Sequence, residues 1–262
     1  MTGTERRGMV VQKRDRHLLE EIAVMRVIDR EQARLVAGFG STTRVNARLL
    51  KLTRAGLLRR FFLGTTSGGA KGLYCLSAKG AQLVESPLRG LQRRMDEMLV
   101  ADFFVQHQLA VNDLYCTLKY KALPPGITFR RWIAFSEPLT PALRLIPDGY
   151  VELGTSSEPL ATFFEVDLGT EALSVWKQKV RNYLTYAISG ECERRFGQRR
   201  FRVAVVATTE RRLHSLRAVI AQATEKIFWL TTLGAVADQG FFAPICFRPR
   251  DNEPQPFVRD TP

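Results

Sequence analysis

The chain has 262 residues, of which 45% are hydrophobic and 25% are charged, and its formal net charge is +13 at pH 7. This balance is that of an ordinary globular protein with one or two domains. Its four cysteines are far apart and form no C-x-x-C pair, which argues against a metal–thiolate site and a disulfide framework. No segment approaches about 18 uninterrupted apolar residues, so we expect a cytoplasmic protein without a membrane partner.

The positive charge is concentrated in the first third of the chain. Residues 1–97 hold 19 Lys and Arg against 9 Asp and Glu, whereas residues 98–262 hold 20 against 17. A basic module attached to a nearly balanced remainder is typical of nucleic-acid-binding proteins. We therefore expect duplex DNA as a partner, with a merely solvated basic surface as the alternative.

Apolar spacing and turn residues in this basic third predict short helices followed by two strands. Asp29 and Ser41 mark two helix starts, because their side chains can accept hydrogen bonds from the first helical turn. Ser77 marks a third start in the same way. The elements expected are helices at 14–25, 30–36, 42–54 and 78–84 and strands at 57–63 and 73–76.

The helix at 42–54 has two distinct faces. Val45, Leu49 and Leu52 form its buried stripe, and the opposite face is small, basic and hydroxyl-bearing, which suits insertion into a major groove. The glycine-rich segment 64–72 can lie along a phosphate backbone. The residues predicted to contact DNA are Thr43, Arg44, Arg48, Lys51, Arg54 and Lys71.

The run Leu49-x-x-Leu-x-x-Ala-Gly-Leu-Leu58 is common in winged-helix proteins, which residues 10–88 therefore resemble. This resemblance implies a winged helix-turn-helix that binds duplex DNA, as a homodimer where the DNA site is two-fold symmetric. A three-helix unit that uses the same face for protein contacts is the alternative.

A linker is predicted at 86–97, and an apolar helix at 99–118. Phe103, Leu109, Val111 and Leu114 are its core candidates. The helix also carries His107 and Asn112, but a helix packed over other elements often buries such groups with their hydrogen bonds satisfied. We therefore assign His107 no catalytic role, and the sequence leaves the roles of both residues open.

Two apolar runs, 148–153 and 160–167, predict strands joined by a hairpin. Their pairing would bring Asp148, Glu165 and Asp167 to one edge of a sheet. Mg²⁺ prefers oxygen ligands of this kind, and a metal held there would activate water against a phosphodiester. Carboxylates at strand ends also cap turns, which is the simpler explanation.

A helix is predicted after these strands, with Lys177 and Lys179 beside its apolar stripe. On the expected helical wheel Lys179 and Tyr183 share one flank and Lys177 lies on the other, so only one lysine should reach the carboxylates. The stripe expected to be buried consists of Leu173, Trp176, Val180, Leu184 and Ala187.

Pro147, Asp148 and Glu165 resemble the metal-site motif of the PD-(D/E)xK nuclease superfamily. Asp167 stands where that motif has lysine, and Lys179-x-x-x-Tyr183 stands where some members place a migrated lysine or a Gln-x-x-x-Tyr motif. The resemblance implies Mg²⁺ or Mn²⁺ held by Asp148 and Glu165, with Asp167 as a third ligand and Lys179 orienting or activating water. The extra negative charge of Asp167 leaves open a binding platform that does not cleave DNA.

A second resemblance covers roughly residues 14–235 and is sharpest at Glu165-Val-Asp-x-Gly-Thr-Glu171. The order of motifs is similar to that of the replication-relaxation family of bacterial plasmids and integrative elements. This implies a setting of plasmid replication and DNA relaxation, with replication or mobilisation proteins as partners. The other motifs are His107-x-Leu109-x-x-Asn112-Asp113, Trp132, Pro147-Asp148 and Lys179-x-x-x-Tyr183.

The remaining sequence completes an α/β pattern, with strands predicted at 201–207 and 227–233 and a helix at 211–223. An arginine cluster precedes the first of these strands, and it would either follow phosphates beside the acidic residues or form a solvated loop. Its members are Arg194, Arg195, Arg199, Arg200 and Arg202.

The sequence thus predicts an α+β or α/β protein. A winged helix-turn-helix at 10–88 precedes a nuclease-like α/β domain with a central mixed sheet at 98–248 and a flexible tail at 249–262. We expect a DNA-binding protein of plasmid or mobile-element replication or relaxation. The alternatives are a metal-dependent endonuclease that nicks or cleaves DNA, and a transcriptional regulator whose second domain only mediates dimerisation or partner contact.

Overall fold

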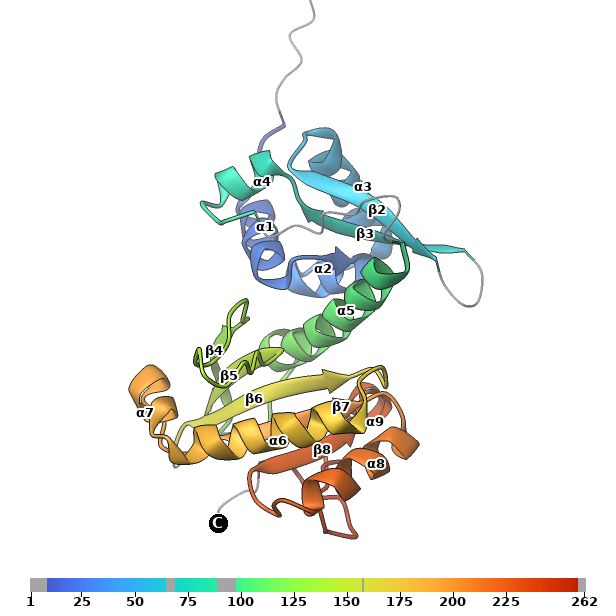
Figure 1. The fold of residues 1–262 in the computed structure, drawn as a ribbon. Coiled ribbons are helices and arrows are strands. Elements are labelled where there is room, and N and C mark those ends of the chain that lie inside the picture. Colours follow the sequence, from blue (N-terminus) through green and yellow to red (C-terminus); the bar gives the residue numbers. More distant parts are fainter. Residues whose placement is uncertain (1–8, 65–68, 89–97, 157, 259–262) are drawn as a thin grey trace, which may run out of the picture. The chain divides into compact units, whose positions relative to one another are not determined.

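The computed structural model describes residues 9–64, 69–88, 98–156 and 158–258 (Figure 1). In the helix that begins at residue 98, side chains are described from residue 103. Within these ranges the chain is an α+β protein with nine helices, a three-stranded sheet and a five-stranded mixed sheet. It divides into two compact units, Met1–Cys116 and Thr117–Pro262. None of the helices in the described ranges has the length and apolarity needed to cross a membrane.

In its described part the first unit contains four helices and most of a fifth, together with a small antiparallel sheet of order β1-β3-β2. The predicted helix caps are present: the Asp29 and Ser77 side chains accept hydrogen bonds from Gln32 N at 2.8 Å and Gly80 N at 3.0 Å, and Ser41 caps α3 in the same way. The elements are α1 (Lys13–Met25), β1 (Ile28–Asp29), α2 (Arg30–Val36), α3 (Thr42–Arg54), β2 (Leu58–Gly64), β3 (Ala70–Leu76), α4 (Ala78–Leu83) and α5 (Met98–Tyr120).

Most of α5 belongs to the first unit, so the boundary between the units falls inside this helix and not at the linker expected from sequence (residues 89–97 of that linker lie outside the described ranges). The reason is hydrogen bonding. Asn112 Nδ2 donates to the carbonyls of Met25 at 3.1 Å and Val27 at 2.6 Å, and the Tyr115 hydroxyl donates to Glu21 at 2.5 Å. Asn112 therefore has a structural role, which is one of the roles that the sequence left open.

The core side of α5 differs from expectation at one residue. Phe103 was a core candidate, but 55% of its surface is exposed. Val105 and Leu109 instead pack with Val27, Leu63 and Leu73. Phe103 precedes Val105 by two residues, which places it roughly 200° around the helix and away from this cluster.

The second unit is built on a sheet of order β4-β5-β6-β7-β8. β4, β5 and β6 pair antiparallel, and β6, β7 and β8 pair parallel, so the predicted hairpin and the predicted mixed sheet are both present. The elements are β4 (Thr128–Ile133), β5 (Gly149–Gly154), β6 (Leu160–Asp167), α6 (Leu173–Ile188), α7 (Glu191–Phe196), β7 (Arg202–Ala207), α8 (Glu210–Ala221), β8 (Phe228–Thr232) and α9 (Leu233–Gln239).

Strand alternation gives β6 two differently covered faces. Phe163 faces the core beneath α6, where its ring lies 5.9 Å from that of Tyr183, whereas Phe164 contacts Phe241 at 5.4 Å on the other face. Figure 1 shows α6 and α8 lying along the sheet. Because side chains alternate with a period of two, Glu165 and Asp167 share the Phe163 face and project beneath α6.

The tail predicted to be flexible from residue 249 is packed as far as it is described. Cys246 and Gln255 exchange two backbone hydrogen bonds of 3.0 and 2.8 Å. Phe257 is fully buried, with its ring 4.8 Å from Phe241 and 5.6 Å from Trp229. The backbone pairing and the buried aromatic ring together fix the segment. Residues 259–262 lie outside the described ranges.

Candidate functional site

The hairpin between β5 and β6 brings two acidic residues together. Gly149 is paired with Phe164, so the preceding residue, Asp148, lies opposite Glu165. The Asp148 backbone N donates to Phe164 O at 3.1 Å, and its Oδ2 accepts from Val166 N at 2.7 Å. These two bonds fix Asp148 at the mouth of the hairpin, half-buried beside the fully buried Glu165.

Glu165 is held from α6 by two side chains. Lys179 Nζ lies 3.0 Å from Oε2, and the Tyr183 hydroxyl donates to Oε1 at 2.6 Å. Lys177 is exposed. The prediction that only one of the two lysines reaches the carboxylates is therefore confirmed, and that lysine is Lys179. It also forms an ion pair with Glu171 at 2.9 Å.

The buried stripe of α6 is rotated relative to the prediction. Leu173, expected to be buried, is 37% exposed, whereas Tyr183, expected on a flank, is fully buried. Tyr183 tolerates this position because its hydroxyl has an acceptor in Glu165. The residues of the observed stripe are Trp176, Val180, Tyr183 and Tyr186.

The electrostatics of this cluster follow from its burial. Burial raises the pKa of Glu165 to about 7; the positive charge of Lys179 opposes this rise and the negative charge of Asp148 adds to it. Burial lowers the pKa of Lys179, but its interactions with Glu165 and Glu171 outweigh that effect and raise the pKa above its ordinary value. Lys179 is therefore a fixed cation at neutral pH and not a proton acceptor.

Asp167 lies in a different arrangement from its two acidic neighbours. Arg212 binds both of its oxygens, with Nε 2.8 Å from Oδ1 and Nη2 2.8 Å from Oδ2. Trp176 Nε1 donates to Oδ2 at 2.5 Å and Gly169 N donates to Oδ1 at 2.7 Å. Burial raises the pKa of Asp167, but the hydrogen bonds from Arg212 and Trp176 outweigh burial and lower the pKa overall.

These contacts engage both oxygens of Asp167, the residue expected as a third metal ligand. Among the described residues no group of three or more His, Cys, Asp or Glu side chains is arranged to hold a metal. Asp148 and Glu165 remain as an adjacent pair. One or two carboxylates with bound water are an ordinary ligand set of Mg²⁺. Both Glu165 oxygens are also engaged, by Lys179 and Tyr183, so an ion at this pair would share them with these two side chains.

On the first unit, α3 presents most of the predicted DNA-contacting residues to solvent. Thr43, Arg44, Lys51 and Arg54 are all exposed, opposite the buried Val45, Leu49 and Leu52. Lys71 on β3 is exposed and forms an ion pair with Asp29 at 2.8 Å.

Arg48 is the exception on this helix. Its Nε donates to Asp15 Oδ1 at 2.6 Å, and its Nη2 contacts Asp15 Oδ2 and Val10 O. Asp15 is only 1% exposed, so the pair joins α3 to α1. The structure therefore gives Arg48 a bracing role inside the unit. Sequence analysis missed this because the two residues are far apart in the chain.

A model of the replication-relaxation family matches residues 19–200. The chain belongs to the replication-relaxation family. The resemblance stated from the sequence is thereby confirmed, and the family suggests a role in plasmid or mobile-element replication or relaxation. No curated protein and no solved structure gives a match.

In this replication-relaxation protein the matched segment runs from within α1 to just before β7. It includes α3, the Asp148–Glu165 pair and both α6 residues that hold Glu165. It ends before Arg212. The partner of Asp167 therefore comes from beyond the match, and sequence analysis did not single it out. The signal available was a second carboxylate on the same buried strand face, which needs a cation of its own.

The arginine cluster before β7 was expected beside the acidic residues in one interpretation, and that placement is wrong. Thr162 pairs with Arg202, and Asp167 pairs with Ala207, because β6 and β7 are parallel. Residues that precede β7 therefore lie at the start of β6, whereas Asp167 ends it. At about 3.3 Å per residue, the position of Arg202 is roughly 10 Å from that of Glu165 and roughly 16 Å from that of Asp167 along the strands.

Proposed function

We propose that this protein binds duplex DNA through α3 and the β2–β3 hairpin, as a winged helix-turn-helix, in plasmid or mobile-element replication or mobilisation. The observation that carries the proposal is the division of α3 into two faces. Four basic or hydroxyl-bearing side chains suited to DNA contact are exposed on one face, and three apolar residues are buried on the other. No acidic residue interrupts the helix, whose sequence is TTRVNARLLKLTR.

The elements around α3 support the same proposal. α2 and α3 are joined by a short turn that contains Gly38 in a positive-φ conformation, and the antiparallel β2–β3 pair follows. Arg59 and Arg60 on β2 are exposed and add positive charge, although sequence analysis did not propose them. Basic side chains on a helix and an adjoining hairpin allow base-edge and phosphate contacts together.

The test is duplex binding by the Arg44→Glu, Lys51→Glu double variant over a range of salt concentrations. If both residues contact phosphate, the slope of log affinity against log salt should fall by about 2. A matched control is Lys121→Glu with Arg211→Glu, which makes the same charge change at exposed residues of the second unit. Equal binding by wild type and the α3 variant would overturn the proposal.

One observation favours a second candidate function, which is metal-dependent nicking or cleavage of DNA. Asp148 lies opposite Glu165, and Lys179 places a cation on that pair. Asp148 and Glu165 would hold Mg²⁺ or Mn²⁺, and the ion would supply activated water for phosphodiester hydrolysis. Lys179 would orient the water and stabilise negative charge on the phosphate, and Tyr183 would fix the Glu165 carboxylate.

Incubation of plasmid DNA with Mg²⁺ or Mn²⁺ distinguishes the two functions. Nicking by wild type that is lost in both Asp148→Ala and Glu165→Gln would support the nuclease. Lys177→Ala serves as the control, because Lys177 is exposed on the same helix. If wild type nicks with neither metal and neither metal raises its melting temperature, the second unit is a platform for DNA, partner proteins or a second copy of the chain.

A further inference from the structure

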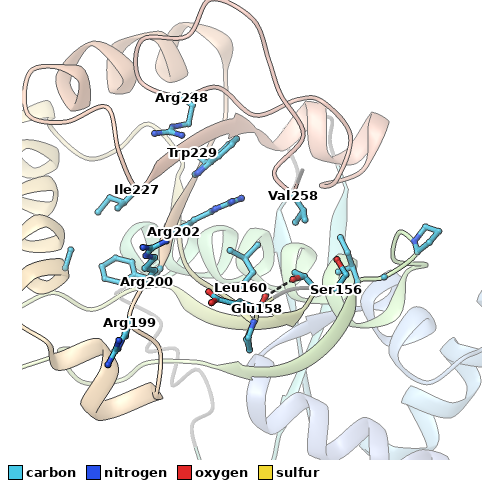
Figure 2. Close-up of a pocket in the computed structure, with 17 residues that line it drawn as sticks. Ser156, Glu158, Leu160, Arg199, Arg200, Arg202, Ile227, Trp229, Arg248 and Val258 are labelled. Carbon is cyan, nitrogen blue, oxygen red and sulfur yellow. Dashed lines mark hydrogen bonds between the residues drawn. The ribbon is translucent and has the colours of Figure 1, made fainter. Parts of the chain in front are cut away.

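The second unit contains a cavity of about 770 Å³ at the end of the sheet away from Asp167. Its walls include the first residues of two parallel strands, Leu160 of β6 and Arg202 of β7, and Trp229 near the start of β8 (Figure 2). The volume lies in the range of pockets that bind small ligands, about 300–1,000 Å³. The proposed DNA face on α3 and the acidic pair use none of these residues.

Four arginines line this cavity: Arg199, Arg200, Arg202 and Arg248. One acidic side chain, Glu158, lines it as well. Outside the lining set, Glu193 forms an ion pair with Arg199 at 2.8 Å. Among the residues that the structure describes around the cavity, the arginines outnumber these two carboxylates, and an excess of positive charge around a concave surface attracts anions.

Two of the arginines are held in place by one aromatic ring. The Arg202 and Arg248 guanidinium carbons lie 4.7 and 5.1 Å from the Trp229 ring centroid, and Figure 2 shows Trp229 between them. Arg202 also donates to the Phe257 carbonyl, and Arg248 donates to the Glu225 carbonyl at 2.5 Å. Carbonyl acceptors and ring contacts fix the positions of these two side chains.

Arg200 differs from the other three arginines. It is exposed, and within the described ranges it makes no hydrogen bond or ion pair. The positive charge of Arg200 can therefore bind a ligand without breaking an interaction that stabilises the fold. Substitution of Arg200 therefore tests ligand binding with the least effect on folding, because its loss leaves no buried group without a partner.

We propose that this cavity binds the phosphate of a nucleotide unit, either in a single nucleic-acid strand or in a free mononucleotide. Planar guanidinium groups hold phosphate oxygens by paired, charge-assisted hydrogen bonds. The apolar wall that includes Leu160, Phe201 and Ile227 would cover the sugar or base. Trp229 is flanked by two guanidinium groups, so phosphate and not base stacking dominates recognition. The proposal does not depend on duplex binding or cleavage by this protein.

The experiment measures binding of phosphate-bearing probes to the full-length protein by calorimetry. The probes are thymidine 5′-monophosphate and a short single-stranded oligodeoxythymidine, with thymidine as the phosphate-free control. Wild type is compared with Arg200→Ala and Arg200→Glu. The matched control is Arg194→Ala, which removes the same charge from an exposed position on α7 outside the cavity. All variants are also prepared with Arg44→Glu and Lys51→Glu, so that strand binding by α3 does not contribute.

We expect Arg200→Ala to weaken phosphate-dependent binding by about tenfold, the equivalent of one charge-assisted hydrogen bond, and Arg200→Glu to weaken it further. The control should bind as wild type. If Arg200 variants lose binding of both probes, the cavity is a general nucleotide-phosphate site. If they lose binding of the oligonucleotide alone, it is a site for a nucleic-acid strand. If they lose binding of the monophosphate alone, it is a site for a free nucleotide. Binding of neither probe by wild type, or equal binding by wild type and Arg200→Glu, overturns the proposal.

Discussion

Lys179 Nζ lies 3.0 Å from Glu165 Oε2, and this contact joins α6 to the buried strand β6 beside Asp148. The lysine holds in place a carboxylate that burial would otherwise keep neutral. Burial nevertheless dominates, since the pKa of Glu165 is about 7 against an ordinary value of 4.5. Whether the carboxylate is charged in the folded protein is therefore decided within the physiological pH range.

The first prediction concerns stability against pH. A carboxyl whose folded-state pKa is raised contributes stability that is fully present below its unfolded pKa and is lost as pH rises through its folded pKa. The Glu165 contribution should therefore decline between about pH 4.5 and pH 7. Denaturant unfolding of wild type and Glu165→Gln measures it, and the difference between their stabilities should shift in the variant's favour as pH rises. A pH-independent difference would contradict the raised pKa.

The second prediction concerns divalent metal. Binding of Mn²⁺ to Asp148 and Glu165 requires ionised Glu165, so the cation competes with the proton. The rise in melting temperature caused by Mn²⁺ should be larger at pH 8 than at pH 6, and it should be absent from Asp148→Ala. Asp167→Asn is the informative comparison, because the structure gives this carboxylate to Arg212 and not to a metal. A metal effect abolished by Asp167→Asn, without unfolding, would mean that Asp167 is a ligand after all.

The third prediction concerns the Arg212–Asp167 pair. Removing Arg212 leaves a fully buried carboxylate without its cation, and breaking a buried pair in this way costs about 3–5 kcal/mol. Arg212→Ala should be destabilised by that order, as measured by chemical unfolding. Adding Asp167→Asn should recover part of the loss, since it removes the uncompensated charge. Purely additive effects would show that the two residues do not interact.

The fourth prediction separates folding from DNA binding on α3. Arg48→Ala should lower stability by about 2–4 kcal/mol, because Asp15 is buried and loses its partner. Duplex affinity measured well below the melting temperature should change little. Arg44→Ala should show the reverse, with weaker binding and nearly unchanged stability, because Arg44 is exposed. Similar binding defects in both variants would place Arg48 at the DNA.

The features that the sequence predicted correctly are those written in neighbouring residues. Asp29, Ser41 and Ser77 cap helices because a capping side chain needs only the next turn of its own helix. The β5–β6 hairpin follows from two apolar runs and a turn. These local signals were sufficient to bring Asp148 opposite Glu165.

What sequence analysis missed depends on pairing between distant segments. Asp167 and Arg212 are separated by 45 residues, and Arg48 and Asp15 by 33. The periodic spacing of apolar residues along the sequence does not predict which distant charged residues will pair. β4 was missed because its burial is mixed, with exposed arginines along its length. The interpretation that placed the arginine cluster beside the acidic residues was wrong for the same reason, since the position of the cluster depends on whether β7 runs parallel to β6.

The hydrogen bonds of Asn112 set a limit on how this protein can be cut into fragments. A fragment that ends at residue 88, where the sequence alone would end the first domain, would lack Asn112 and expose the Met25 and Val27 carbonyls. It would also remove Tyr115 from the buried Glu21. Expression of the first unit in isolation should therefore give a stable product only when the chain extends through the end of α5 at Tyr120.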